Sequence, residues 1–202
     1  MSSKALKLTG LLIFLIIIFQ FIPKNSIRES AAMPAGDIGT TSEAVIISVP
    51  GTINPGVPVR LKIPRINIDA AIESVGLTSQ GAVDVPRGSV NTAWYNLGPR
   101  PGENGSAVIT GHYGVWKNGT PTVFNNLSKL RPGDKIYVRD KKGITFTFIV
   151  REIKKYNPRA DASDVFISSD GEAHLNLITC LGAWNKASKS YPKRLVIFAD
   201  KE

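Results

Sequence analysis

From about residue 57 to its end, the sequence is a series of short β-type runs separated by Gly, Pro, Asn and Asp, which restricts the possible folds more than any other feature. In the longest run, Ile144, Phe146 and Phe148 alternate with threonines, as in a strand with one buried face. Many short strands with little helix predict an all-β sandwich or barrel. The expected strands are residues 57–63, 66–75, 106–112, 135–138, 144–153, 173–180 and 194–199, with a hairpin turn at 140–143 and one helix at 121–130.

The N-terminal part of the chain has a different character. Residues 8–22 are almost entirely apolar and uncharged, and residues 5–23 would form about 28 Å of helix, close to the roughly 30 Å hydrocarbon core of a bilayer. Lys4, Lys7 and the amino terminus precede this segment, and their charges favour a cytoplasmic N-terminus. We therefore expect residues 1–4 in the cytoplasm, a transmembrane signal-anchor helix at residues 5–23, and the rest of the chain outside the cell membrane.

Two further segments complete the expected domain organisation. Residues 24–56 are rich in Ser, Ala, Gly, Thr and Pro and lack sustained periodicity, which is typical of a flexible extracytoplasmic linker. Residues 57–202 have the size of one ordinary domain. A cleaved signal peptide is the alternative for the N-terminus, but residues 30–32, which resemble a cleavage site, lie far beyond the apolar run.

The charge of the chain limits its partners. The formal net charge is +9 and the isoelectric point about 9.7. The lysines and arginines are scattered and no nucleic-acid motif accompanies them, so we expect no nucleic-acid partner. An anionic envelope surface, either membrane or wall polymer, fits such a positive field equally well.

Cys180 is the only cysteine, so no intramolecular disulfide can form. A single cysteine is ordinarily a buried, inert thiol, whereas a nucleophile needs a partner for its proton and a donor for the charge on the attacked carbonyl. Of the two histidines, His174 would share the strand 173–180 with Cys180 but lie about 20 Å away, so we expect a surface or strand-end residue there. His112, at the end of the strand 106–112 and beside a loop, is the better candidate.

Three motifs stand in a fixed order with characteristic spacings. Thr110-Gly-His112 comes first, Asn176-Leu-Ile-Thr-Cys180 ends 68 residues after the histidine, and Arg194-Leu-Val-Ile-Phe-Ala199 begins after 13 intervening residues. They resemble the histidine position, the TLxTC signature and the downstream strand arginine of the sortase family. The resemblance covers residues 57–200, and we expect only a modest structural effect from Asn176 in place of the signature threonine. Residues 61–66, 124–130 and 133–134 resemble the family's first-strand motif, helix and turn.

The resemblance implies a closed eight-stranded β-barrel with one or two short helices, preceded by the transmembrane helix. As the nucleophile of a cysteine transpeptidase, Cys180 would attack the Thr–Gly carbonyl of an LPxTG-like sorting signal and form a thioester, which an amine acceptor then resolves. His112 would protonate the leaving amine and deprotonate the incoming one. Arg194 would hydrogen-bond the substrate or the oxyanion. The expected substrate-binding residues are Thr110, Ile178 and Thr179.

The resemblance also implies partners. These are secreted proteins with a C-terminal sorting signal, an amine acceptor such as a peptidoglycan precursor or pilin lysine, and the membrane. The single anchor and compact domain look more like class E or F than like a pilin polymerase. The loop 155–170, which would help to hold the signal, contains Asp161, Asp164 and Asp170 but no glycine-containing calcium-loop pattern. One cysteine and two histidines cannot fill a closed zinc site without a carboxylate, so we expect no metal and no cofactor.

Two alternatives stay open from the sequence. Another cysteine enzyme of the envelope fits less well, because papain-like peptidases place the cysteine before the histidine and residues 178–182 do not match the motif of L,D-transpeptidases. The other alternative is a non-catalytic, membrane-tethered β-barrel for binding or adhesion, with Cys180 buried and inert.

Overall fold

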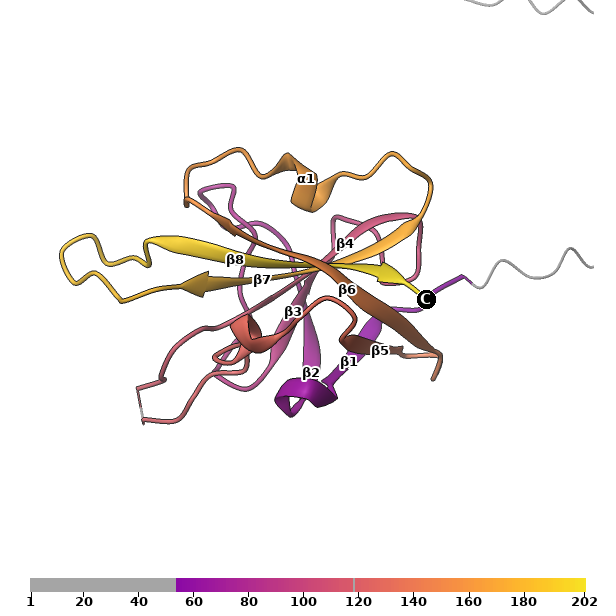
Figure 1. Cartoon of the computed structure of the whole chain (residues 1–202), viewed down its shortest axis with the longest axis horizontal. Helices are drawn as coiled ribbons and strands as arrows, with labels where there is room; N and C mark the ends of the chain where they lie inside the picture. Colours follow the sequence, from indigo (N-terminus) through magenta and orange to yellow (C-terminus); the bar gives the residue numbers. More distant parts are fainter. Residues whose placement is uncertain (1–53, 118) are drawn as a thin grey trace, which may run out of the picture. The chain divides into compact units, whose positions relative to one another are not determined.

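The computed structural model describes residues 54–117 and 119–202, and within them eight strands form a closed barrel (Figure 1). The expected all-β barrel is therefore confirmed. The order of the strands around the barrel is β1-β2-β3-β4-β7-β8-β6-β5. Their bounds are β1 Pro58–Ile63, β2 Ile68–Val75, β3 Thr92–Tyr95, β4 Gly105–Gly111, β5 Lys135–Asp140, β6 Thr145–Tyr156, β7 Ala173–Leu181 and β8 Lys193–Lys201.

Short helices connect some of the strands. The 3-10 helices η1 and η2 span Pro64–Ile66 and Leu127–Lys129, and the single-turn α-helix α1 spans Ser163–Phe166. None of the described helices is long and apolar enough to cross a bilayer. The anchor expected at residues 5–23 lies outside the described residues and stays a prediction.

The helix expected at residues 121–130 is wrong except for its last part, which forms η2. The reason is that the amides of this segment bond to a distant part of the chain. The amide of Phe124 donates to the carbonyl of His112 at 3.0 Å, and that of Thr122 donates to Gly114 at 3.0 Å. These long-range bonds replace the local ladder that a helix requires.

The linker expected to reach residue 56 ends earlier, because residues 54–56 are bound to the barrel. Pro55 and Gly56 are buried. The amide of Gly56 donates to the buried Asp140 carboxylate at 2.7 Å, and Arg100 donates to the carbonyl of Pro55 at 3.0 Å. The folded domain therefore includes this short stretch.

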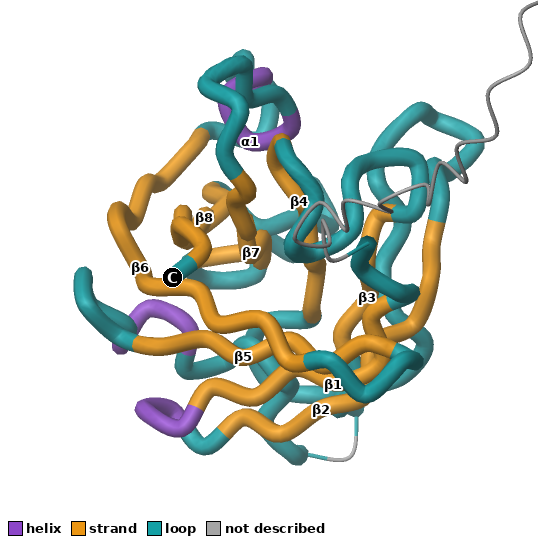
Figure 2. Tube along the Cα trace, turned by 90° about the vertical axis from the view of Figure 1, so that its right-hand side faces the viewer, coloured by secondary structure: helices purple, strands orange, loops and turns teal. Residues whose placement is uncertain are grey.

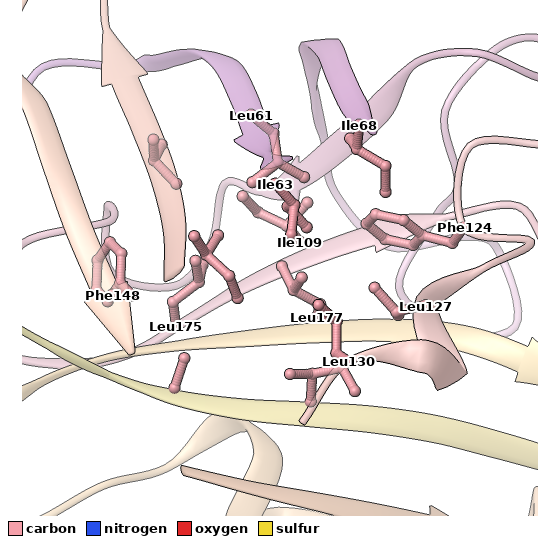
Figure 3. Close-up of a cluster of buried hydrophobic side chains, with 14 of the residues drawn as sticks. Leu61, Ile63, Ile68, Ile109, Phe124, Leu127, Leu130, Phe148, Leu175 and Leu177 are labelled. Atoms are coloured by element: carbon pink, nitrogen blue, oxygen red, sulfur yellow. The ribbon is translucent and has the colours of Figure 1, made fainter. Parts of the chain in front are cut away.

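The interior of the barrel is filled by apolar side chains that alternate along the strands. Figure 3 shows side chains from the strands converging with Phe124 and Leu127, which come from the segment outside them. Each such side chain contributes about 1.5–3 kcal/mol when fully buried. The largest completely buried residues include Leu61, Ile63, Ile109, Phe124, Leu127, Phe148, Leu175 and Leu177.

A second apolar cluster covers the outer face of β4, β7 and β8. Val108 on β4 and Val196 and Phe198 on β8 pack against Val165 of α1, which lies over these strands (Figure 1). These strands are covered on both faces, and most of β7 is buried even at its polar residues His174, Asn176 and Thr179. Asn176 of β7 also lies here; its Nδ2 donates to the carbonyl of Val165 at 2.7 Å, while its Oδ1 is buried without a partner among the described residues.

His174 lies at the start of β7, as expected for a strand-end residue, but it is buried and not on the surface. Its exposed fraction is 7%, and its Nδ1 and Nε2 lie 2.8 Å from Asp200 and 2.9 Å from Asp170. Burial lowers the pKa of His174, but the hydrogen bonds to the two carboxylates outweigh it, so the pKa lies above its ordinary value. His174 therefore links the end of the β6–β7 loop to β8 through its two ring nitrogens.

We predict that His174→Gln reduces stability more at low pH than at high pH. A raised folded-state pKa gives stability that is complete below the unfolded pKa of about 6.5 and is lost as the pH rises through the folded value. We expect a loss of about 1 kcal/mol at pH 5.5, because both carboxylates are half exposed, and a smaller loss at pH 9. The free energy of unfolding of the full chain, measured by urea denaturation at both pH values, tests this prediction. An equal loss at both would mean that His174 acts as a neutral hydrogen-bonding residue.

Candidate active site

The parallel pairing of β4 with β7 determines which residues meet at one end of the barrel. The Cα partners keep a constant register along both strands. Beyond the last of these pairs, the hydroxyl of Thr179 donates to the carbonyl of Gly111 at 2.8 Å, which extends the same register by one residue. Continued by one more residue, this register would place His112, the residue after β4, opposite Cys180. Because neighbouring strands lie about 4.8 Å apart, such a register brings the backbones of two residues that are 68 positions apart close together.

The antiparallel pairing of β7 with β8 adds the third residue. Cys180 and Arg194 are direct Cα partners. Leu195 and Ile197 of β8 belong to the barrel interior, so by alternation Arg194 lies on the outer face. The three residues expected to be catalytic thus come from three adjacent strands, at the end of β4, the end of β7 and the start of β8. His174 lies at the opposite end of β7.

His112 is fixed by contacts to its backbone and to its ring. Its carbonyl accepts hydrogen bonds from the Phe124 amide at 3.0 Å and the Thr122 hydroxyl at 2.8 Å. Its Nε2 lies 3.0 Å from the carbonyl of Pro86, and its ring packs against Trp116 with centroids 5.1 Å apart. These contacts hold the imidazole in place before any substrate binds.

Glycine is required at position 111, between Thr110 and His112. A Cβ atom there would lie 2.5 Å from the Phe124 ring, which packs beneath this end of β4. The absence of a side chain at Gly111 lets the 121–124 segment approach the strand closely enough to bind the His112 carbonyl.

The protonation of Cys180 depends on its burial and on Arg194. The thiol is partly buried, and burial raises its pKa above the ordinary value. The positive charge of Arg194 lowers the pKa and offsets part of that increase. On balance, burial favours the neutral form of the thiol. Arg194 is half-buried, and its Nη1 donates to the carbonyls of Tyr191 and Lys193 at 3.4 and 3.2 Å.

Aromatic residues that the sequence did not single out surround the thiol. Tyr191 lies near Cys180, and its pKa is raised by burial and then by that thiol. Its ring contacts Tyr113 and Trp184, with centroids 5.6 and 5.1 Å apart. Gly114 has φ +91°, and a Cβ there would lie 2.9 Å from the Tyr191 hydroxyl. In the sequence, the aromatic residues in the loops after β4 and β7 could have indicated that these loops surround the thiol.

The three residues expected to bind substrate have different environments. Thr110 and Thr179 are 6% and 3% exposed, and their hydroxyls donate to backbone carbonyls, that of Thr110 to Asp84 at 3.2 Å. These two threonines hold the strands and the β2–β3 loop together. Ile178 is partly exposed and shares the outer face of β7 with Cys180, so it offers surface next to the thiol.

The aspartates of the loop before β7 already have partners. Asp161 accepts from the Ser163 amide at 2.9 Å, and Asp164 accepts from the Tyr156 hydroxyl at 2.6 Å. Asp170 is bound to His174. Across residues 54–117 and 119–202, no group of three or more His, Cys, Asp or Glu is arranged to hold a metal ion.

Comparisons with known proteins agree on one family. A sequence-family model described as Sortase domain matches residues 61–202. Sortase C1 of Streptococcus agalactiae, solved in complex with MTSET, is 25% identical with a TM-score of 0.55; the match covers 71% of this chain and 66% of that one, slightly under two thirds. A comparison with curated proteins finds no match.

Two more distant solved structures show the same fold. Sortase C-1 from Actinomyces oris is 24% identical with a TM-score of 0.55, and the match covers 74% of this chain and 76% of that one. A lid mutant of sortase A from Corynebacterium diphtheriae is 22% identical with a TM-score of 0.56, and the match covers 74% and 72% of the two chains.

We predict that Arg194→Met moves the alkylation of Cys180 to higher pH, because it removes the charge that lowers the thiol pKa. The measurement is the rate of iodoacetamide labelling of the full chain between pH 6 and 11, followed by intact mass. Lys193→Met is the matched control, since it removes a neighbouring cation whose ammonium group bonds to Asn157. Equal shifts in both variants would contradict a specific role for Arg194.

Proposed function

This chain belongs to the sortase family, and we propose that it is a cysteine transpeptidase that joins secreted proteins to an amine of the cell envelope. Its substrate is an LPxTG-like sorting signal, which it cleaves between Thr and Gly. The observation that supports the proposal is the pairing of Cys180 with Arg194 between β7 and β8, at the strand end toward which the β4–β7 register directs His112.

The first half-reaction forms a thioester. The Cys180 sulfur attacks the Thr carbonyl carbon while His112 receives the thiol proton. The C–N bond then breaks, and His112 gives the proton to the departing glycine amine. Because burial favours the neutral thiol, the attack needs His112 to receive the proton as the thiolate forms. His112 and Cys180 are expected to approach each other more closely in the substrate complex.

The second half-reaction returns the enzyme to its starting state. The acceptor amine attacks the thioester carbonyl and loses a proton to His112. The C–S bond breaks, and the departing sulfur regains the proton. Arg194 stabilises the oxyanion in both steps, because its guanidinium keeps several N–H donors beyond the two backbone contacts made by Nη1.

The surroundings of the thiol suggest how the sorting signal is held. Ile178 contributes apolar surface beside Cys180. The exposed Trp184 packs against the ring of Tyr191, which lies near the thiol. Thr110 and Thr179 act by holding the strand ends that carry the reacting groups.

We further propose that the enzyme works at the outer surface of the cell membrane. The apolar residues 5–23 would anchor it, the residues up to 53 would form the linker, and the barrel would be the catalytic domain. Tethering would keep the barrel near the site of protein export.

We predict that the full chain, mixed with a pool of LPxTG-like peptides, gains the mass of the acyl fragment. Cys180→Ala should show no adduct, because the thioester cannot form. His112→Ala should lower the rate of transfer by about 10²–10⁴-fold, the usual contribution of a general acid and base. The measurements are intact mass spectrometry and product formation with an amine acceptor.

His174→Gln is the matched control for this experiment. It changes the other histidine, which lies at the far end of β7, and transfer should stay within a few fold of the unaltered enzyme at 25 °C. Transfer by Cys180→Ala would contradict the nucleophile assignment. A thiol that neither forms an adduct nor reacts with an alkylating agent would instead support the non-catalytic binding module.

A further inference from the structure

A hollow of about 470 Å³ lies between η1 and η2. Figure 2 shows these two short helices near each other on the side of the barrel away from α1, and Figure 1 agrees. The hollow is therefore separate from the face of β4, β7 and β8 that carries the catalytic residues. Its polar lining consists of Arg65, Asn67, Asn126, Ser128, Lys129 and Arg131.

The lining of this hollow carries excess positive charge. Asp134 is the nearby carboxylate, and it lies 3.9 Å from Arg65 while accepting the backbone amide of Arg131 at 2.8 Å. One carboxylate therefore faces three cations. A concave site with charges of one sign concentrates ions of the opposite sign.

The donors of the lining are also largely unused. Within the described part of the chain, the side chains of Asn126, Ser128, Lys129 and Arg131 make no hydrogen bond or ion pair. They combine ammonium, guanidinium, hydroxyl and amide donors around one space. A tetrahedral anion accepts hydrogen bonds in several directions at once, and an arginine fork matches two of its oxygens, so phosphate fits this set better than a single carboxylate does.

A second hollow extends the positive surface along β1. Its volume is about 360 Å³, and Arg60, Lys62 and Arg139 line it with Asp69, which pairs with Arg60 at 2.6 Å. Arg60 and Arg139 are direct cross-strand partners of β1 and β5. Like charges in such positions destabilise a sheet, so an anion that occupies this surface would relieve their repulsion.

We propose that the hollow between η1 and η2 is a binding site for a phosphate or phosphodiester group. Its size admits a phosphate with a small organic group attached. The site does not depend on the proposed transpeptidase function. The same phosphate chemistry occurs in membrane headgroups and in soluble phosphate esters, and the experiment separates these two sources.

The test is a titration in which sn-glycerol 3-phosphate is added to the full chain in a neutral detergent. Binding is monitored by calorimetry and by the amide NMR signals of Asn67 and Ser128. The affinity of Lys129→Gln/Arg131→Gln should fall at least tenfold. The control Lys155→Gln/Arg159→Gln removes the same charge from exposed positions of β6 and the loop after it, and its affinity should stay within twofold.

To identify the source of the phosphate, the amide signals of Asn67 and Ser128 are recorded for the full chain in lipid nanodiscs. Shifts of the same two signals with phosphatidylglycerol, but not with phosphatidylcholine alone, would assign the site to a lipid headgroup. Shifts that require added glycerol phosphate would assign it to a soluble phosphate ester. No shift with either probe, or an equal loss of affinity in the control variant, would overturn the proposal.

Discussion

The parallel register between β4 and β7 is the constraint on which the rest of the site depends. A slip of one residue would turn every side chain of a strand to the opposite face, so that Cys180 would point into the barrel and Leu177 out of it. Two features oppose such a slip: the interior packing of Leu175 and Leu177, and the bond from Thr179 to the Gly111 carbonyl. The forces that stabilise the barrel also align the reacting groups.

The outer face of β7 changes from covered to open along its length. Near its start, Asn176 lies under α1, and farther along, Cys180 is only partly buried. This intermediate environment accounts for the chemistry of the thiol. Complete burial would leave it inert, and full exposure would remove the desolvation that keeps it protonated until a substrate arrives. Arg194 supplies the opposing charge from the neighbouring strand.

Patterns among neighbouring residues predicted those features of the fold that depend on short-range interactions. The alternation through Phe146 and Phe148 identified β6, and the motif spacing identified the family. The four-residue β3 was missed because it is too short to show alternation. The helix at 121–130 was wrong because long-range bonds to the His112 carbonyl override local preference. The burial of His174 and the grouping of Tyr191 with Trp184 depend on how distant segments meet.

The catalytic pair is aligned by contacts between strands and not by the length of chain that joins them. Insertions and deletions in the loop after β6 can therefore accumulate during evolution without changing the register of β4 and β7. The loop after β4 is more restricted, because its Trp116, Thr122 and Phe124 contact His112. Recognition can diversify by exchange of whole loops between related enzymes while the reaction itself is inherited unchanged.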